Sequence, residues 1–385
     1  MISSKCSLTT STSNGTSPDE KTNLPDLTGR LLKDHLLIYK IDEGGFGGIY
    51  LARKYEKGKV NVTPKFDFSS IPSNELNEYY VVKAESNFTE GGCGLKMEVK
   101  ILNKIKKIFN KSEQFAEITI ANRRSKYSYV FMTLLGQSLK HLLRIVPNGK
   151  FTDSTWLRIG IQSLYSVKQL HEVGFIHRDL KPANFVIGHN NDVMRCRFIH
   201  LIDFGLSRQY IIEDEIGKIR YRKARKRVDF RGTERYCSMS MHYDKEQKRV
   251  DDIWSLLFAL TEMRNDLPWS NVDSDKLEET KKSYKSICII KLLPIELENS
   301  IKNLDIISNE NFDERPNYEE IYKSLVDCMK NNNYSFDDKY DWEKEIDKNC
   351  PKMTKYSDMY NLFAKDHFSN RIIINNDINK KNELK

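Results

Sequence analysis

The chain has 385 residues, a formal net charge of +8 at pH 7 and a mean hydropathy of −0.60. No apolar run approaches the roughly eighteen residues that span a bilayer, and the first residues lack a signal-peptide core, which argues against a membrane or secreted protein. Its seven cysteines are scattered without a Cys-x-x-Cys pair, which argues against a disulfide framework or zinc site and for a reducing compartment.

A glycine-rich segment at residues 41–50 follows the apolar residues Leu36, Leu37 and Ile38. Glycine lets the backbone approach phosphate oxygens without a side-chain clash. Such a stretch is by itself as often an ordinary turn. Its place ahead of a strand that carries a lysine favours a phosphate-binding loop.

That strand is predicted at residues 79–85, Tyr-Tyr-Val-Val-Lys-Ala-Glu, from its aromatic and β-branched composition. It carries Lys83, although a strand lysine is ordinarily a solvated edge residue. Before it, residues 55–78 form a long connection with Pro64 and Pro72. Such a connection either binds a partner or is a neutral surface insertion, and we favour the insertion.

Glu98 lies on a predicted helix. Leu95, Leu102 and Ile105 stand at −3, +4 and +7 from it, which is helical spacing and places them on its face. This face should be turned toward the protein body, so Glu98 is expected to point inward. A solvent-facing helix acid is the alternative.

Two later segments carry residues in a spacing typical of phosphoryl transfer. Residues 175–184 are Phe-Ile-His-Arg-Asp-Leu-Lys-Pro-Ala-Asn, and residues 201–205 are Leu-Ile-Asp-Phe-Gly. Asp179 can accept the proton of an attacking hydroxyl, while Asn184 and Asp203 can hold Mg²⁺. A polar loop followed by a buried Asp-Phe turn is the alternative, but chance seldom produces both segments.

Taken together, these segments resemble the eukaryotic protein kinases. Lys181 is typical of the serine/threonine kinases, and residues 230–242, Phe-Arg-Gly-Thr-Glu-Arg-Tyr-Cys-Ser-Met-Ser-Met-His, resemble the casein kinase 1 superfamily. Within it, the tau-tubulin kinases are most similar at residues 203–210, 230–233, 251–256 and 340–343. The resemblance covers about residues 29–345.

The resemblance implies ATP and Mg²⁺ as cofactors. It implies catalytic roles for Asp179, Lys181, Lys83, Glu98 and Thr233, with Glu98 as the partner of Lys83, and Mg²⁺ ligands at Asn184 and Asp203. Nucleotide contacts are implied for Ile41, Gly44, Gly45, Phe46, Gly47, Ile49, Lys83, Met132 and Leu135. Of these, Met132 would gate the back of the adenine pocket and backbone groups near Leu135 would pair with adenine. It also implies that Asp252, at the start of an apolar and therefore buried helix, holds the catalytic-loop backbone.

The chain departs from the family pattern at several positions. The first glycine of the loop is replaced by Asp42, which predicts weaker nucleotide binding. Other departures are Val81, Cys237 and Ser240, and Cys237 is expected to be a small buried thiol. These changes leave a pseudokinase, a binding scaffold with little or no catalysis, as the alternative to an active enzyme.

Eight basic residues and one acid lie between Lys218 and Arg231. This run, with Arg178, is predicted to bind acidic or already phosphorylated substrates, and the candidate anion site is Arg178, Arg222, Lys223, Arg225 and Arg231. A nuclear import signal at residues 222–227 and a solvated charged loop are the alternatives. Nucleic-acid binding is not favoured, because no array of stacking aromatic residues accompanies the run.

We therefore expect an α+β, two-lobed kinase fold, with a small antiparallel β lobe carrying one main helix and a larger, mostly helical lobe. Residues 1–28 are predicted to be a disordered Ser/Thr-rich tail, 29–135 the small lobe, 136–345 the large lobe and 346–385 an Asn/Lys-rich extension. The expected partners are protein substrates, acidic, phosphorylated or cytoskeletal. We expect a cytoplasmic monomer, with nuclear import as the alternative location.

Overall fold

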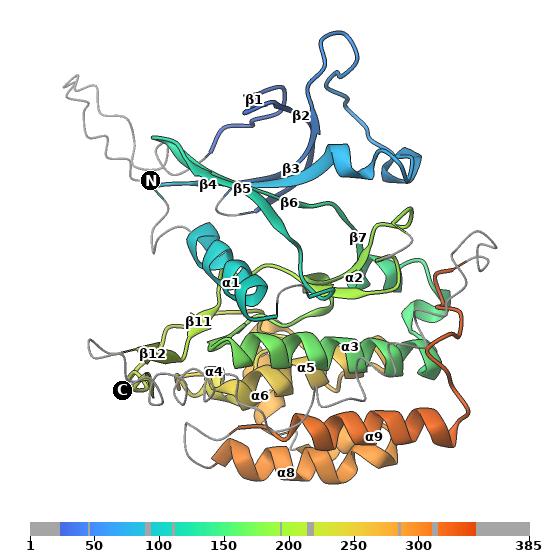
Figure 1. Ribbon diagram of the computed structural model, residues 1–385. Coiled ribbons are helices and arrows are strands. Elements are labelled where there is room, and N and C mark those ends of the chain that lie inside the picture. The colour runs from blue at the N-terminus through green and yellow to red at the C-terminus, as the bar shows by residue number, and fades with distance from the viewer. Residues whose placement is uncertain are drawn as a thin grey trace, which may run out of the picture.

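Strands rich in tyrosine, valine and phenylalanine build the upper lobe of the molecule (Figure 1). The computed structural model describes residues 24–44, 47–88, 94–109, 112–192, 195–213, 219–283, 286–309 and 315–343. The upper sheet has the order β1-β2-β3-β4-β6-β5, with antiparallel neighbours throughout. Its strands are β1 (Leu31–Leu32), β2 (His35–Gly44), β3 (Gly47–Lys54), β4 (Tyr79–Ser86), β5 (Ile118–Arg123) and β6 (Tyr127–Thr133).

One long helix, α1 (Gly94–Phe109), packs against this sheet. Its buried residues are Leu95, Glu98, Ile101, Leu102 and Ile105, so one face of the helix is turned inward. The spacing read from the sequence predicted this orientation, and the burial of Glu98 among apolar residues confirms it.

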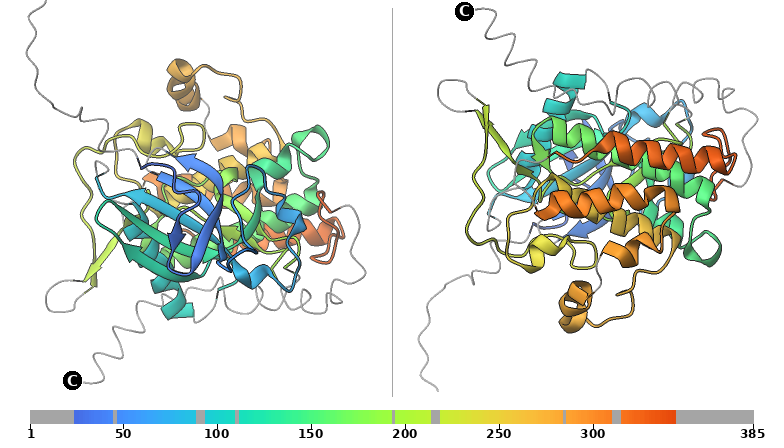
Figure 2. Two further views of the ribbon diagram at one scale, coloured as in Figure 1. Left: turned by 90° about the horizontal axis from the view of Figure 1, so that it is seen from above. Right: turned by 90° about the horizontal axis from the view of Figure 1, so that it is seen from below.

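The lower lobe is mainly helical. Its helices are α2 (Leu139–Leu143), α3 (Asp153–Glu172), α4 (Met239–His242), α5 (Arg249–Arg264), α6 (Ser274–Ser283), α7 (Ser286–Ile290), α8 (Glu298–Asn309) and α9 (Tyr318–Asn331). The central helix α5 is buried along nearly its whole length, as its apolar sequence predicted. It contacts α3 and α8, while α8 and α9 lie side by side on the underside (Figure 2). The predicted two-lobed α+β kinase fold is confirmed.

Short strands follow the upper sheet in the chain and border the loops of the lower lobe. They are β7 (Leu135–Ser138), β8 (Phe175–Ile176), β9 (Phe185–Gly188), β10 (Ile199–Leu201), β11 (Arg208–Gln209), β12 (Ile211–Glu213) and β13 (Ile219–Tyr221). They pair in the orders β10-β9-β7, β11-β8 and β12-β13. The loops after β8 and β10 therefore start from fixed points in the lower lobe.

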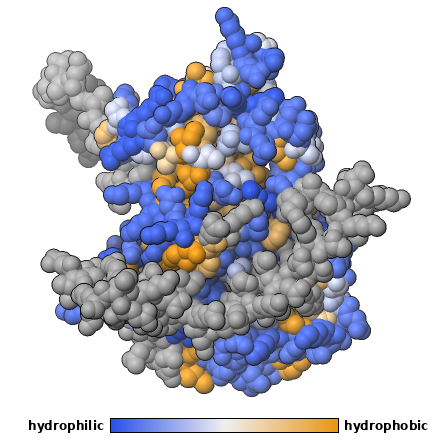
Figure 3. Space-filling view, in the orientation of Figure 1, coloured by the Kyte–Doolittle hydropathy of each residue, from blue (hydrophilic) through white to orange (hydrophobic). Residues whose placement is uncertain are grey.

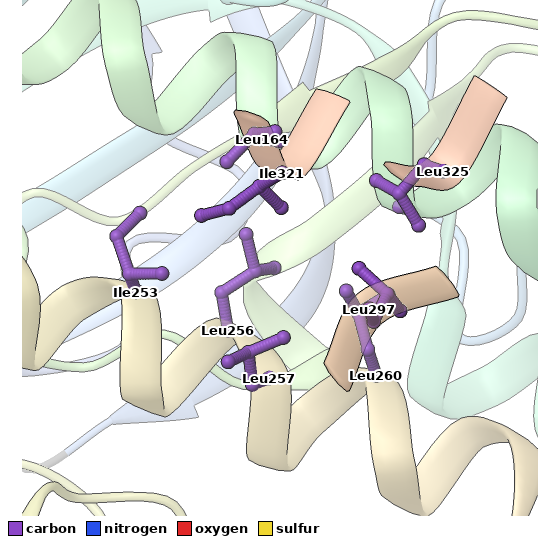
Figure 4. Close-up of a pocket in the computed structure, with 9 residues that line it drawn as sticks. Leu164, Ile253, Leu256, Leu257, Leu260, Leu297, Ile321 and Leu325 are labelled. Atoms are coloured by element: carbon purple, nitrogen blue, oxygen red, sulfur yellow. The ribbon is translucent and has the colours of Figure 1, made fainter. Parts of the chain in front are cut away.

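A small apolar cavity lies between α3, α5 and α9 (Figure 4). Its volume is about 10 Å³, at the lower limit for holding a single water molecule. Gly160 and eight leucine and isoleucine side chains line it. It is a packing gap in the core and has no room for a ligand.

The long connection before β4 is part of the packed structure. Val60 and Ile71 are buried together with Leu134, at the junction of β6 and β7. The rings of Phe66 and Phe68 pack on each other with centroids 5.3 Å apart. Most of the connection is exposed, as expected of a surface insertion, but Val60 and Ile71 anchor it beside the connection between the lobes, and its expected neutral role stays a prediction.

This connection also reaches the lower lobe. His189 Nε2 lies 2.9 Å from the backbone oxygen of Phe68. The side-chain amide of Asn191 donates to the backbone oxygens of Ser69 and Ile71, at 3.1 and 2.6 Å. We call residues 66–71 the interlobe strap, because they bond the upper lobe to the turn between β9 and β10.

Within the described ranges, no helix is both long and apolar enough to cross a membrane. On the face drawn in Figure 3, hydrophilic residues predominate and hydrophobic ones form small separate patches. Most of the predicted N-terminal tail and all of the predicted C-terminal extension lie outside the described residues.

Candidate active site

The amine of Lys83 lies among three carboxylates. Its Nζ is 3.0 Å from Oε2 of Glu98 and 2.9 Å from Oδ1 of Asp203. Oε1 of Glu85 is 3.9 Å from the same nitrogen. Burial opposes the charge on the amine, but the carboxylates outweigh burial, and the pKa of Lys83 is raised above its ordinary value. Lys83 is therefore a fixed positive charge where β4, α1 and the loop after β10 meet.

The sequence predicted Lys83, Glu98 and Asp203 as site residues but missed Glu85. This acid is only 5% exposed. Its Oε2 accepts the backbone N–H of Leu95, at 2.9 Å, in the first turn of α1. Side chains two apart on a strand point to the same face, so the spacing of Glu85 from Lys83 was a usable signal.

The carboxylate of Asp179 is held by two side chains on the loop side of the lower lobe. Oδ1 accepts the Thr233 hydroxyl at 2.7 Å, and Oδ2 accepts Lys181 Nζ at 2.7 Å. Lys181 Nζ is also 3.1 Å from Oγ1 of Thr233, so the three groups form a closed triangle. Asp179 is 8% exposed, and its carboxylate therefore has one defined orientation.

Asn184 and Asp203 present the oxygen ligands that Mg²⁺ prefers, one amide and one carboxylate. The amide nitrogen of Asn184 donates to the backbone oxygen of Asp179 at 2.8 Å, so its amide oxygen is the atom that would bind a metal. Burial would raise the pKa of Asp203, but Lys83 holds it below its ordinary value, which keeps the carboxylate ionised. These residues fit a divalent cation, whose charge would offset the excess of acids around Lys83.

Asp252, at the start of α5, fixes the loop that carries Asp179. Its two oxygens accept the backbone N–H groups of His177 and Arg178, at 2.6 and 2.9 Å. His171 Nε2 lies 2.8 Å from the same carboxylate. Burial raises the pKa of Asp252, but these donors outweigh burial and lower it. Arg178 has a φ of 71°, a left-handed conformation that these two bonds hold in place.

The chain matches a known protein family. The sequence model of the protein kinase domain family matches residues 37–336. The chain belongs to the protein kinase family. The bounds of the predicted lobes and tails stay a prediction, since the match fixes only that the domain lies within the predicted 29–345.

Several relatives share this domain. K06H7.1 of Caenorhabditis elegans, whose name gives it as a serine/threonine-protein kinase, is 38% identical over 320 residues, 82% of this chain and 84% of the relative. The inactive tau-tubulin kinase ttbk-6 of the same organism is 35% identical over 242 residues, 59% of this chain and 80% of the relative. The casein kinase I homolog RAG8 of Kluyveromyces lactis is 30% identical over 246 residues, 62% of this chain and 44% of the relative. The predicted similarity to casein kinase 1 and tau-tubulin kinases is confirmed.

The glycine loop of this kinase joins β2 to β3. A Cβ at Gly47 would lie 1.9 Å from the backbone oxygen of Ala84, so only glycine fits there. Asp42, which replaces the first glycine, is exposed. Its Oδ1 accepts a hydrogen bond from the backbone N–H of Glu43, with 2.8 Å between oxygen and nitrogen. Gly44 ends β2, while Gly45 and Phe46 lie outside the described residues.

The residues predicted to contact adenine lie around the same strands. Met132, 9% exposed, is the register partner of Val81, which is on the same face of β4 as Lys83. Ile49 is the register partner of Lys83 itself. Leu135 begins β7 opposite Gly188, and like Ile41 it is half-buried. Their contacts with a nucleotide stay a prediction.

The predicted anion site is brought together only in part. Arg225 Nε is 2.6 Å from one oxygen of the buried Glu246, and Arg208 Nε is 3.2 Å from the other. Burial lowers the pKa of Arg178 to about 10, and the positive charge of the neighbouring Arg208 contributes to the same shift. Arg208 and Arg225 thus pair with a carboxylate of the chain itself, while Arg178 donates from Nε to the backbone oxygen of Leu206 at 2.7 Å, and the sequence did not predict Arg208 or Glu246 here.

The other residues of the predicted anion site are Arg222, Lys223 and Arg231. Arg222 donates from Nε to the backbone oxygen of Gln209 at 3.1 Å, while Lys223 and Arg231 are exposed.

Cys237 is 3% exposed and burial raises the pKa of its thiol, as expected for a small buried thiol.

Proposed function

We propose that this protein is an active serine/threonine protein kinase that transfers the γ-phosphate of ATP to hydroxyl groups of protein substrates. The observation that carries the proposal is the closed triangle of Asp179, Lys181 and Thr233, because it orients a carboxylate that can accept the proton of a substrate hydroxyl. The fixed charge of Lys83 is the second support.

Each residue has a defined task in this proposal. Lys83 holds the α- and β-phosphates and is itself oriented by Glu98. Asp179 orients the substrate hydroxyl and takes its proton, while Lys181 offsets charge that develops on the transferring group. Asn184 and Asp203 would hold Mg²⁺, which when bound neutralises phosphate charge. Because no covalent intermediate is needed, positioning and electrostatics supply most of the acceleration.

We further propose that the preferred substrates are acidic or already phosphorylated. Arg208 and Arg225 are compensated by Glu246. Exposed basic side chains remain in the same basic run of residues 218–231: Lys223, Lys226, Arg227 and Arg231. Such a set attracts an anion without a large desolvation cost. Cytoskeletal substrates and a cytoplasmic location, with nuclear import as the alternative, are predictions from the sequence alone.

A pseudokinase scaffold is the second candidate, and two observations favour it. Asp42 brings a carboxylate to the glycine loop, and one relative is named as an inactive tau-tubulin kinase. Against it stand the ion pairs of Lys83 and the orientation of Asp179.

The deciding experiment incubates the protein with γ-labelled ATP and Mg²⁺ and with one acidic peptide in phosphorylated and unphosphorylated forms. We expect label on serine or threonine and faster transfer to the phosphorylated form. A Lys223→Ala, Lys226→Ala double variant should lose that preference and keep transfer to a neutral peptide. ATP binding without any transfer would instead support the scaffold.

A further inference from the structure

We propose that Glu85 is a positioning residue that fixes the first turn of α1 and so holds Glu98 against Lys83. The inference rests on the proposed kinase function for its catalytic consequence, but its structural part stands on contacts of Glu85 alone. It concerns a residue outside the glycine loop, the catalytic loop and the metal ligands.

The first support is the bond between Glu85 and the start of α1. The first four N–H groups of a helix have no partner within the helix. Glu85 Oε2 accepts one of them, from Leu95, at 2.9 Å. A carboxylate at this end also meets the positive end of the helix dipole. The acid comes from β4, so the bond ties the helix to the strand that carries Lys83.

The second support is the geometry that follows from this bond. Leu95 and Glu98 are three residues apart, and both are buried on one face of α1. Fixing the N–H of Leu95 to β4 therefore fixes the turn on which Glu98 stands. The same β4 places Lys83 3.0 Å from Oε2 of Glu98. The two bonds, one from Glu85 and one from Lys83, hold the helix at two successive points.

The third support is the tight packing around the first turn. A Cβ on Gly94 would lie 3.4 Å from Oε1 of Glu85 and 3.1 Å from the Cα of Gly205, two residues after Asp203. There is consequently little space between α1, Glu85 and the Asp-Phe-Gly segment. A movement of α1 away from the sheet would break the bond to Glu85 and the Lys83–Glu98 pair together.

The test compares Glu85→Ala with Glu85→Gln in the full chain. Alanine removes the acceptor, whereas the glutamine oxygen can still accept the N–H of Leu95 without a charge. We expect Glu85→Ala to speed hydrogen exchange of the α1 first-turn amides and to lower kcat by roughly tenfold, the size expected for a lost cap. Glu85→Gln should recover most of both. Hydrogen exchange is measured without substrate, so this readout does not depend on catalysis.

Asn317→Ala is the matched control, because Asn317 caps α9 by accepting the N–H of Glu320 at 3.1 Å, far from Lys83 in the sequence and in the other lobe. It should lower the thermal stability like a lost cap and leave kcat and α1 exchange unchanged. The proposal is overturned if Glu85→Ala leaves α1 exchange at the wild-type rate, or if glutamine rescues nothing. An inactive wild type with the predicted exchange pattern would instead refute the proposed function and keep the positioning role.

Discussion

Lys83 and Asp203 are 120 positions apart in the chain, yet Nζ of Lys83 lies 2.9 Å from Oδ1 of Asp203. The first residue belongs to the sheet of the upper lobe and the second to a loop of the lower lobe. Their contact, together with the Lys83–Glu98 pair, brings α1, β4 and the predicted metal ligand to one point. The structure therefore shows an arrangement in which the groups proposed for phosphate and metal binding are already assembled.

Asp42→Gly should strengthen nucleotide binding. The carboxylate of Asp42 is exposed beside the glycine loop, and a negative charge near phosphates repels them. Its removal should lower the Kd of ATP several-fold, on the order of 1 kcal/mol for charges near a surface. Titration of a fluorescent ATP analogue measures this change. An unchanged or weaker affinity would show that the backbone bond of Asp42 to Glu43 already keeps the charge away from the phosphates.

Glu246→Gln should destabilise the lower lobe in a pH-dependent way. Burial raises the pKa of Glu246, but Arg225 and Arg208 outweigh burial and hold it below its ordinary value of 4.5. A lowered folded pKa means that the carboxylate stabilises the fold above about pH 4.5 and that this stability is lost as the pH falls through the folded pKa. We expect the free energy of unfolding to fall by about 1–2 kcal/mol at neutral pH. The effect is modest because the arginines are partly exposed.

Thermal unfolding of Glu246→Gln and the wild type at neutral and at acidic pH measures this difference. The gap between the two melting temperatures should shrink on acidification below the ordinary pKa of glutamate. A gap of equal size at both pH values would mean that Glu246 stabilises the fold through packing and not through its charge.

Gly160→Ala should stabilise the protein. Gly160 lies within α3, and a Cβ there would meet Leu325 at 3.5 Å and Leu260 at 3.7 Å, which are ordinary van der Waals distances. The new methyl group would fill part of the cavity shown in Figure 4. Because alanine also favours a helix more than glycine does, we expect the free energy of unfolding to rise by about 0.5–1 kcal/mol. A lower melting temperature would show that the helices around the cavity have no tolerance for the added atom.

Removing the strap contacts should speed nucleotide release. The His189→Ala, Asn191→Ala double variant loses the hydrogen bonds to the backbone of Phe68, Ser69 and Ile71. Since each hydrogen bond contributes about 1 kcal/mol, opening of the lobes and release of a fluorescent ADP should become about fivefold faster if one bond limits opening and about a hundredfold faster if all three do. Stopped-flow fluorescence measures the rate.

The control for the strap is Asn331→Ala, which removes a side-chain bond to Glu296, 2.9 Å long, in the lower lobe. The Asn331→Ala variant should release fluorescent ADP at the wild-type rate. If the double variant also releases ADP at the wild-type rate, the strap fills space beside the lobe connection without limiting lobe movement.

The sequence predicted those parts of the site that depend on local spacing. Helical spacing of Leu95, Leu102 and Ile105 correctly predicted the inward face of α1, because burial follows periodicity. Asp179, Lys181, Asn184 and Asp203 lie in two short motifs, 175–184 and 201–205, so their spacing alone marked them, and the structure places Asp203 2.9 Å from Lys83.

Contacts between distant segments were not predictable in the same way. The strap has no periodic pattern, and its bonds go to backbone atoms that any residue provides. Glu246 is separated from the basic run by the residues around Thr233, so nothing local marks it as the partner of Arg225. Asp251 likewise accepts the backbone N–H of Lys248 at 2.5 Å and caps the start of α5, and it is 3% exposed.

The most direct test of the central claim is the rate of γ-phosphate transfer by wild type and Asp179→Asn at saturating ATP and Mg²⁺. Asparagine keeps the size of the side chain but cannot accept the hydroxyl proton. The account predicts a loss of about two to four orders of magnitude in kcat, with ATP affinity and melting temperature nearly unchanged. Equal turnover in the two proteins would contradict the role of Asp179 and with it the proposed reaction.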